Sequence, residues 1–151
     1  MLGLKQSDLA SKAMITRSVL MGLEQHGRKL PDQLALSQVR EAILREGLVF
    51  VDASEAAGEG VRWARPSGKV WVDCLSDARA MLGYTLDELS EKSGVGRYVI
   101  ARLENTRRKR INEQSARRLR DVLFEKGVIV LDEEADLGAG VRLRSGLRAD
   151  K

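Results

Sequence analysis

The chain has 151 residues and a net charge of +4, and 43% of its residues are apolar but only 4% are aromatic. Its single cysteine excludes an internal disulfide, and its single histidine argues against a zinc site. No apolar run approaches the roughly 18 residues of a membrane span, and the sequence does not open on a signal-peptide pattern. We therefore expect a small, mostly helical protein of the reducing cytoplasm, with a mild indication of a polyanionic partner.

The chain matches itself at a shift of 80 residues, without insertions, from its first residue to about residue 66. The match aligns a Leu-Glu pair (Leu23-Glu24 with Leu103-Glu104) and a Gly-x-Gly-Val-Arg motif (58–62 with 138–142). We infer a tandem duplication. The expected organisation is repeat one at 1–65, a linker at 66–71, repeat two at 72–146 and a tail at 147–151.

Repeat one is expected to hold three helices. The first begins at about residue 5, and the second runs from Arg17 to about Gln25 with Thr16 as its N-cap. The third opens at Pro31-Asp32, stops at Gly47 and is expected to bury an apolar side made of Leu34, Leu36, Val39, Ile43 and Leu44. The second helix directs Arg17, Ser18, Met21 and Gly22 outward, and Met14 stands where repeat two has Gly94.

Repeat two opens with a further helix, expected at about 72–82, that has no counterpart in repeat one. A helix, a tight turn and a second helix follow. Thr85 and Glu88 have the spacing of a capping box, and Gly94 supplies the backbone freedom that the turn needs. The second helix runs from about 97 to 105, with Ile100 and Leu103 facing inward.

Each repeat ends in two short runs typical of strands, at 48–51 and 60–63 and again at 128–131 and 140–143, the second pair after a helix at about 112–126. A lone hairpin is marginal in water, so we expect the two hairpins to pair with each other or across a homodimer. The Gly-x-Gly pairs (Gly58/Gly60 and Gly138/Gly140) are interpreted as turns. The expected fold class is mainly α.

The order L-x-x-x-x-G-V-x-x-x-x-I-x-R-L-E-N is formed by Leu89, Gly94, Val95, Ile100, Arg102, Leu103, Glu104 and Asn105. It resembles the helix-turn-helix of the Xre family, the lambda-repressor-like DNA-binding domains. The resemblance implies two such units in tandem, an ion pair between Arg79 and Glu104, and a contact of Gln6 with phosphate or base. Repeat one has no equivalent of Arg79 for its Glu24, so either the sequence begins late or another chain supplies that surface. Some members of the family have lost DNA contacts and serve as protein-interaction modules.

Positive charge is concentrated in repeat two, where residues 94–120 carry a net +7 against +2 for the matching residues 14–40. Arginine can donate two hydrogen bonds to guanine, and tyrosine can reach phosphate or stack. The candidate DNA contacts of repeat two are Arg97, Tyr98, Ala101, Arg102 and Asn105 on the second helix, Thr85 and Leu86 before it, and the loop residues Arg107, Arg108, Lys109 and Arg110. Those of repeat one are Gln6, Arg17 and Ser18.

The leading hypothesis is sequence-specific binding of double-stranded DNA by a prokaryotic transcriptional regulator, acting as a repressor. The alternative is a protein-interaction module (an anti-activator, antitoxin or scaffold) that kept the fold and lost DNA reading in one or both repeats. Met21 and Gly22 favour the alternative for repeat one, which is then the expected docking site of a protein partner. The sequence contains no catalytic set, metal-ligand cluster or cofactor motif, so we expect neither an enzyme nor a cofactor.

Overall fold

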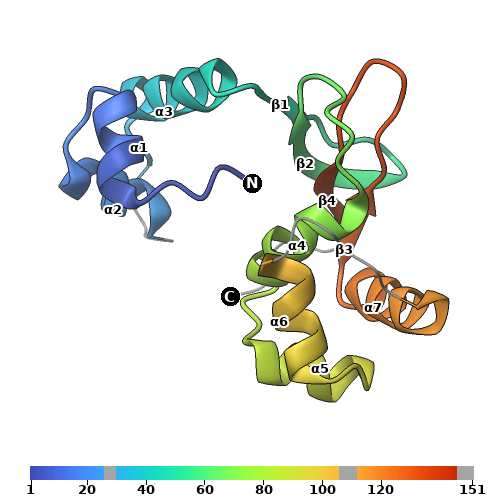
Figure 1. Ribbon diagram of the computed structural model, residues 1–151. Coiled ribbons are helices and arrows are strands. Elements are labelled where there is room, and N and C mark those ends of the chain that lie inside the picture. Colours follow the sequence, from blue (N-terminus) through green and yellow to red (C-terminus); the bar gives the residue numbers. More distant parts are fainter. Residues whose placement is uncertain (26–29, 106–111, 146–151) are drawn as a thin grey trace. The chain divides into compact units, whose positions relative to one another are not determined.

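The computed structural model of the chain describes residues 1–25, 30–105 and 112–145. These residues form seven α-helices, one short 3₁₀ helix and a four-stranded antiparallel sheet (Figure 1). The chain divides into two compact units, Met1–Val49 and Phe50–Lys151. The protein is thus mainly helical with a small sheet, and each unit is described separately below.

The first unit contains α1 (Gln6–Lys12), α2 (Arg17–Glu24) and α3 (Gln33–Arg45). Side-chain caps fix two of the helix starts. Thr16 Oγ1 accepts a hydrogen bond from the Val19 amide at 3.2 Å, and Asp32 Oδ1 accepts from the first turn of α3. The core of this unit is small, and its most buried apolar residues are Ala10, Ala13, Leu20, Ala35, Ala42 and Leu48.

The prediction that α3 buries five apolar residues is wrong for three of them. Leu34, Leu36 and Leu44 are exposed, at 70%, 43% and 42% of their surface, whereas Ala35 and Ala42 are buried. Val39 and Ile43 are partly buried. The helix therefore turns a narrow stripe of alanines toward α1 and α2, and the leucines that dominate its hydrophobicity lie on the outside.

The second unit contains the 3₁₀ helix η1 (Trp71–Cys74), α4 (Leu75–Met81), α5 (Leu86–Ser93), α6 (Arg97–Asn105) and α7 (Glu113–Glu125). The segment expected as one helix at 72–82 is therefore a 3₁₀ turn followed by an α-helix. Asn112 caps α7 by accepting a hydrogen bond from the Ser115 amide at 2.7 Å. The core is built from fully buried side chains of four helices and two strands: Leu75, Leu89, Ile100, Leu103, Leu119, Leu123, Val128 and Val141.

The sheet joins the strands of the two repeats in one layer. Its strands are β1 (Leu48–Val51), β2 (Ala57–Trp63), β3 (Val128–Leu131) and β4 (Gly140–Arg144), in the order β1-β2-β4-β3. Val61 pairs with its repeat equivalent Val141, so the antiparallel pairing of β2 with β4 has a local two-fold axis (Figure 1). The two hairpins thus pair with each other inside one chain, and the expected linker at 66–71 lies within the second unit.

Three of the four glycines in the Gly-x-Gly pairs lie in strands, which corrects their interpretation as turns, whereas Gly138 lies in the loop before β4. Gly58 and Gly60 lie within β2 and Gly140 begins β4. A Cβ at Gly60 would overlap the Cβ of Arg142, and a Cβ at Gly140 would overlap that of Arg62. Glycine is required at these positions because each lies directly opposite an arginine on the partner strand.

Each arginine of the repeated motif donates hydrogen bonds to backbone carbonyls of the other repeat. Arg62 donates from Nε to the carbonyl of Gly138 at 2.8 Å, and Arg142 donates from Nε to the equivalent carbonyl of Gly58 at 3.0 Å. Each Nη2 also donates to a loop carbonyl of the other repeat, Asp132 for Arg62 and Asp52 for Arg142. This reciprocal contact fixes the sheet across its local axis.

Candidate nucleic-acid interface

The turn between α5 and α6 follows from three local features. Thr85 and Glu88 form the expected capping box, in which the Thr85 amide donates to Glu88 Oε2 at 2.7 Å and the Glu88 amide donates to Thr85 Oγ1 at 3.2 Å. The hydrogen bond from the Thr85 backbone lowers the pKa of the Glu88 carboxyl. Gly94 ends α5 in the left-handed region at φ +65°, and Val95 is buried next to it.

The two faces of α6 differ sharply in exposure. Ile100 and Leu103 are buried in the core of the second unit. Tyr98 is 87% exposed, Arg97, Arg102 and Asn105 are exposed, and Ala101 is partly buried between them. We call the surface formed by Arg97, Tyr98, Ala101, Arg102 and Asn105 the α6 outer face. It unites five of the residues named from the sequence on one side of one helix.

An ion pair holds α6 against α4. Arg79 of α4 donates from Nε and Nη2 to the two carboxylate oxygens of Glu104, both at 2.7 Å, and from Nη1 to the carbonyl of Tyr84 at 2.7 Å. The Glu104 side chain is only 8% exposed, and its hydrogen bonds raise the pKa of Arg79. The expected pair therefore forms, and it sets the direction in which α6 presents its outer face.

Two contacts on the α6 outer face were not expected from the sequence. Arg97 Nε lies 3.4 Å from Asp87 Oδ1, in the first turn of α5. Asn105 Nδ2 donates to the carbonyl of Ala101 at 2.9 Å, so its amide donor is bonded within its own helix. Helical periodicity could not predict the contact between Arg97 and Asp87, because this contact joins two helices across a turn.

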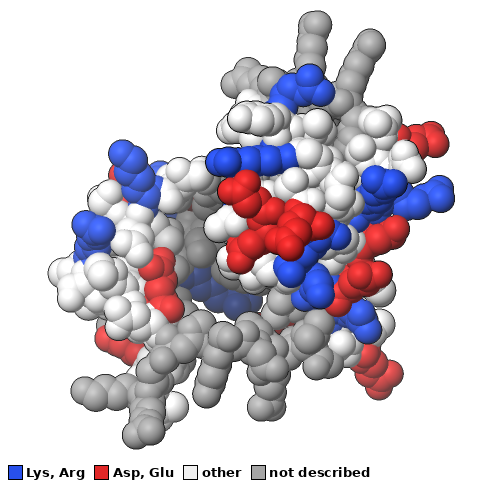
Figure 2. Space-filling model, turned by 90° about the horizontal axis from the view of Figure 1, so that it is seen from below, with Lys and Arg blue, Asp and Glu red and all other residues white. Residues whose placement is uncertain are grey.

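The charge around the α6 outer face is mixed. Asp87, Glu88 and Glu91 are exposed on α5. Arg120 of α7, one of the basic residues in the positive segment 94–120, donates from Nη2 to Asp132 Oδ2 at 2.7 Å. Figure 2 likewise shows acidic side chains beside basic ones on the described surface. The expected loop contacts Arg107, Arg108, Lys109 and Arg110 lie outside the described residues.

The remaining candidates of the second unit serve the fold as well. Thr85 is exposed, but its hydroxyl donates to Glu88 Oε2 at 2.8 Å as part of the helix cap. Leu86, the first residue of α5, is partly buried. Thr85 is the N-cap of α5 and Leu86 its first residue, so both directly precede Asp87, which contacts Arg97 of the α6 outer face.

In the first unit, the equivalent polar residues bond to one another. Gln6 donates from Nε2 to Glu24, and Arg17 donates from Nη2 to Gln6 Oε1 at 3.4 Å. Gln6 thus gives Glu24 a hydrogen-bond partner where the second unit uses Arg79. Ser18 is exposed. Met14 is 75% exposed at φ +56°, the left-handed conformation that its equivalent Gly94 adopts without strain.

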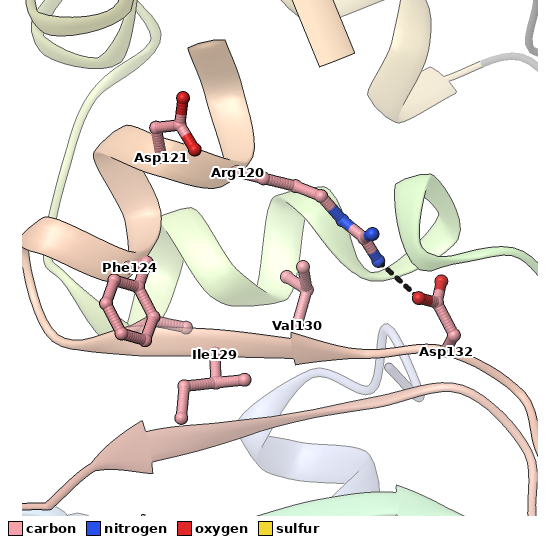
Figure 3. A pocket seen from close by; sticks show the side chains of 7 residues that line it. Arg120, Asp121, Phe124, Ile129, Val130 and Asp132 are labelled. Carbon is pink, nitrogen blue, oxygen red and sulfur yellow. Dashed lines mark hydrogen bonds and ion pairs between the residues drawn. The ribbon is translucent and has the colours of Figure 1, made fainter. Parts of the chain in front are cut away.

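A pocket of about 250 Å³ opens between α7 and β3 (Figure 3). Phe124, Ile129 and Val130 form its apolar wall, and Arg120 meets Asp132 at one end. The Arg120 guanidinium also lies 4.7 Å from the centre of the Trp71 ring. These contacts pair the charge of Arg120 and tie α7 to η1 and to the residue that follows β3. The pocket was not predicted from the sequence.

Among residues 1–25, 30–105 and 112–145, no group of three or more histidine, cysteine or acidic side chains is placed to hold a metal ion. In the same described ranges, no helix combines the length and apolarity needed to cross a bilayer. Comparisons with protein-family models, with curated proteins and with solved structures find no match to the chain.

Proposed function

We propose that the protein is a transcriptional regulator that binds double-stranded DNA through the second unit, with α5 and α6 acting as a helix-turn-helix. In this proposal α6 enters the major groove, where Arg97 and Arg102 donate hydrogen bonds to base edges and Tyr98 contacts phosphate or base. The protein acts as a repressor in a prokaryotic cytoplasm, and the first unit is a second, weaker helix-turn-helix.

One observation carries the proposal: the α6 outer face is exposed, while the opposite side of α6 is joined to α4 by the ion pair of Glu104 with Arg79. Tyr98 is 87% exposed, and Glu104, on the buried side of the helix, accepts two hydrogen bonds of 2.7 Å from Arg79. A helix that reads base edges must present donors outward from a fixed position. An arginine pair on a mobile helix would bind phosphate with little selectivity.

The test is fluorescence anisotropy with a short labelled duplex over a series of salt concentrations. We expect binding that weakens steeply with salt, and a loss of at least about tenfold in affinity in the Arg97→Ala/Arg102→Ala variant. A Lys126→Ala/Arg144→Ala variant removes the same charge from exposed positions outside α6 and should stay within about twofold of the parent. Absence of binding below about 10 μM at low salt, or an equal loss in the control, contradicts the proposal.

A second candidate function, protein docking by the first unit, is favoured by its exposed apolar side chains. Met14 and Met21, the equivalents of Gly94 and Ala101, are 75% and 39% exposed, and Leu34 is 70% exposed. Methionine side chains adapt to varied apolar surfaces. If docking is the main function, Met14→Gln/Met21→Gln abolishes partner capture, Arg97→Ala/Arg102→Ala does not, and the parent protein binds no DNA.

A further inference from the structure

We propose that Asp87 is a specificity-determining residue of the second unit, because it holds the Arg97 guanidinium in the direction needed to read a base. The inference rests on the proposed DNA-binding function and adds an acidic residue to the recognition surface. Its consequence is that Asp87 lowers affinity for DNA in general while it raises the preference for one sequence over others.

The contact joins the starts of two consecutive helices. Arg97 is the first residue of α6 and Asp87 the second of α5, and Arg97 Nε lies 3.4 Å from Asp87 Oδ1. Both side chains are solvent-accessible, at 55% and 69% of their surface. The contact uses Nε, so it does not involve the terminal Nη1 and Nη2 groups, the pair that can form an end-on fork to guanine O6 and N7.

The charges at this position argue against a purely structural role for Arg97. A cation in the first turn of a helix faces the positive end of the helix dipole, which disfavours Arg97 at the start of α6. Asp87 favours the start of α5 by the same rule and offsets the unfavourable charge of Arg97. An exposed ion pair of this kind adds little to stability, so its main effect is to restrict the rotamers of the arginine.

Restricting Arg97 before DNA arrives removes part of the ordering cost from the binding step. The same carboxylate repels phosphates, so an arginine that turns toward the DNA backbone gains less from the change. Both effects favour the base-directed position of the guanidinium over the phosphate-directed one. Asp87 therefore disfavours non-specific binding more than specific binding.

The first unit contains a related contact with a neutral acceptor, although it uses a terminal guanidinium nitrogen where Arg97 uses Nε. Arg17, the equivalent of Arg97, donates from Nη2 to Gln6 Oε1 at 3.4 Å, and Gln6 lies in the first turn of α1. In both units, then, the arginine that begins the second helix is held from the first turn of the helix before it. The acceptor is one residue earlier in repeat one, so the contact is maintained although the residue that supplies it differs.

The experiment compares two affinities of each variant at one salt concentration, for a duplex enriched by selection with the parent protein and for a random duplex. We expect Asp87→Ala to bind the random duplex more tightly and to lower the ratio of the two affinities by about three- to fivefold, the range open to an exposed ion pair. Asp87→Asn keeps an acceptor but no charge and should lower the ratio less. Glu91→Gln removes an exposed charge one turn further along α5 and should leave the ratio unchanged.

Two results overturn the inference: a ratio in Asp87→Ala within about twofold of the parent, or an equal fall in Glu91→Gln. Either result shows that Asp87 acts only as one more negative charge. The failure of the proposed function looks different, because the parent protein itself then binds no duplex or yields no enriched sequence. Thermal unfolding of each variant checks that the α5 helix start is intact.

Discussion

Replacing Arg62 by methionine should destabilise the second unit more than the same change at its repeat equivalent, Arg142. The Arg62 residue is 5% exposed, and its guanidinium donates to the carbonyls of Gly138 and Asp132 at 2.8 and 3.1 Å and to Glu134 Oε1 at 3.0 Å. Methionine retains the apolar stem but no donor, so it leaves the carbonyl oxygens of the buried Gly138 and of Asp132 without the bonds from Arg62.

The magnitude follows from the kinds of bond that are lost. A hydrogen bond from a charged donor contributes about 1.5–3 kcal/mol, and the two carbonyl contacts dominate for Arg62. The Glu134 side chain is 65% exposed, so its ion pair adds at most about 1 kcal/mol. We expect a loss of about 3–4 kcal/mol for Arg62→Met, close to the range for breaking a buried ion pair. Arg142 is only partly buried and has Ser54 where Arg62 has Glu134, so Arg142→Met should cost about 2 kcal/mol.

Urea unfolding followed by tryptophan fluorescence measures this difference directly. Trp63 and Trp71 are the two tryptophans of the chain and both lie in the second unit, so the signal reports on the unit that contains the contact. Losses below about 1 kcal/mol in both variants would show that the reciprocal arginine contacts do not hold the sheet. A larger loss for Arg142→Met than for Arg62→Met would refute the reasoning from burial.

Three further predictions concern the helices. Met14→Gly should stabilise the first unit by about 1 kcal/mol in urea unfolding, because the exposed Met14 is strained at φ +56°. Gly94→Ala should destabilise the second unit by a similar amount, because its φ is +65° while the added Cβ meets only the Arg118 side chain, at an ordinary contact distance of 3.7 Å. Arg79→Ala should cost about 3 kcal/mol by leaving the buried Glu104 carboxylate without its arginine, and Arg79→Lys should restore only part of that stability. Burial, reinforced by Asp77 and Asp73, raises the pKa of the Cys74 thiol from 9.0 to about 11. As the pH rises, the unfolded chain loses this proton before the folded chain does, so the free energy of unfolding of the parent should fall relative to that of Cys74→Ala. The expected slope is about 1.4 kcal/mol per pH unit between pH 9 and 11. A difference between the two proteins that stays constant over this range would contradict the burial of the thiol.

The sequence predicted the parts of the fold that depend on neighbouring residues. The strands at 48–51 and 128–131 were predicted with their observed bounds, because β-branched runs bounded by glycine are a local signal. The caps Thr16 and Thr85 and the turn at Gly94 also depend only on residues within one turn of helix. The pairing of Arg79 with Glu104 came from the family resemblance rather than from any local pattern.

Features that depend on long-range packing could not be predicted in the same way. Arg62 contacts Gly138, 76 residues further along the chain, and nothing in its local sequence indicates burial. The predicted apolar side of α3 included three leucines, but the residues of this helix that the core of the first unit buries fully are Ala35 and Ala42. On the α6 outer face, the exposed residues followed from helical spacing, whereas the Asp87 contact required the geometry of the turn.

The location of DNA on the protein tests the central claim most directly. A photoactivatable benzoylphenylalanine at Tyr98, which is 87% exposed on the α6 outer face, should crosslink to bound duplex DNA on irradiation. The same group at Phe124, which is 49% exposed near the end of α7, serves as the control and should not crosslink. Strong crosslinking at position 98 alone is the result we predict. Crosslinking at position 124 with none at position 98 would contradict the assignment of the α6 outer face.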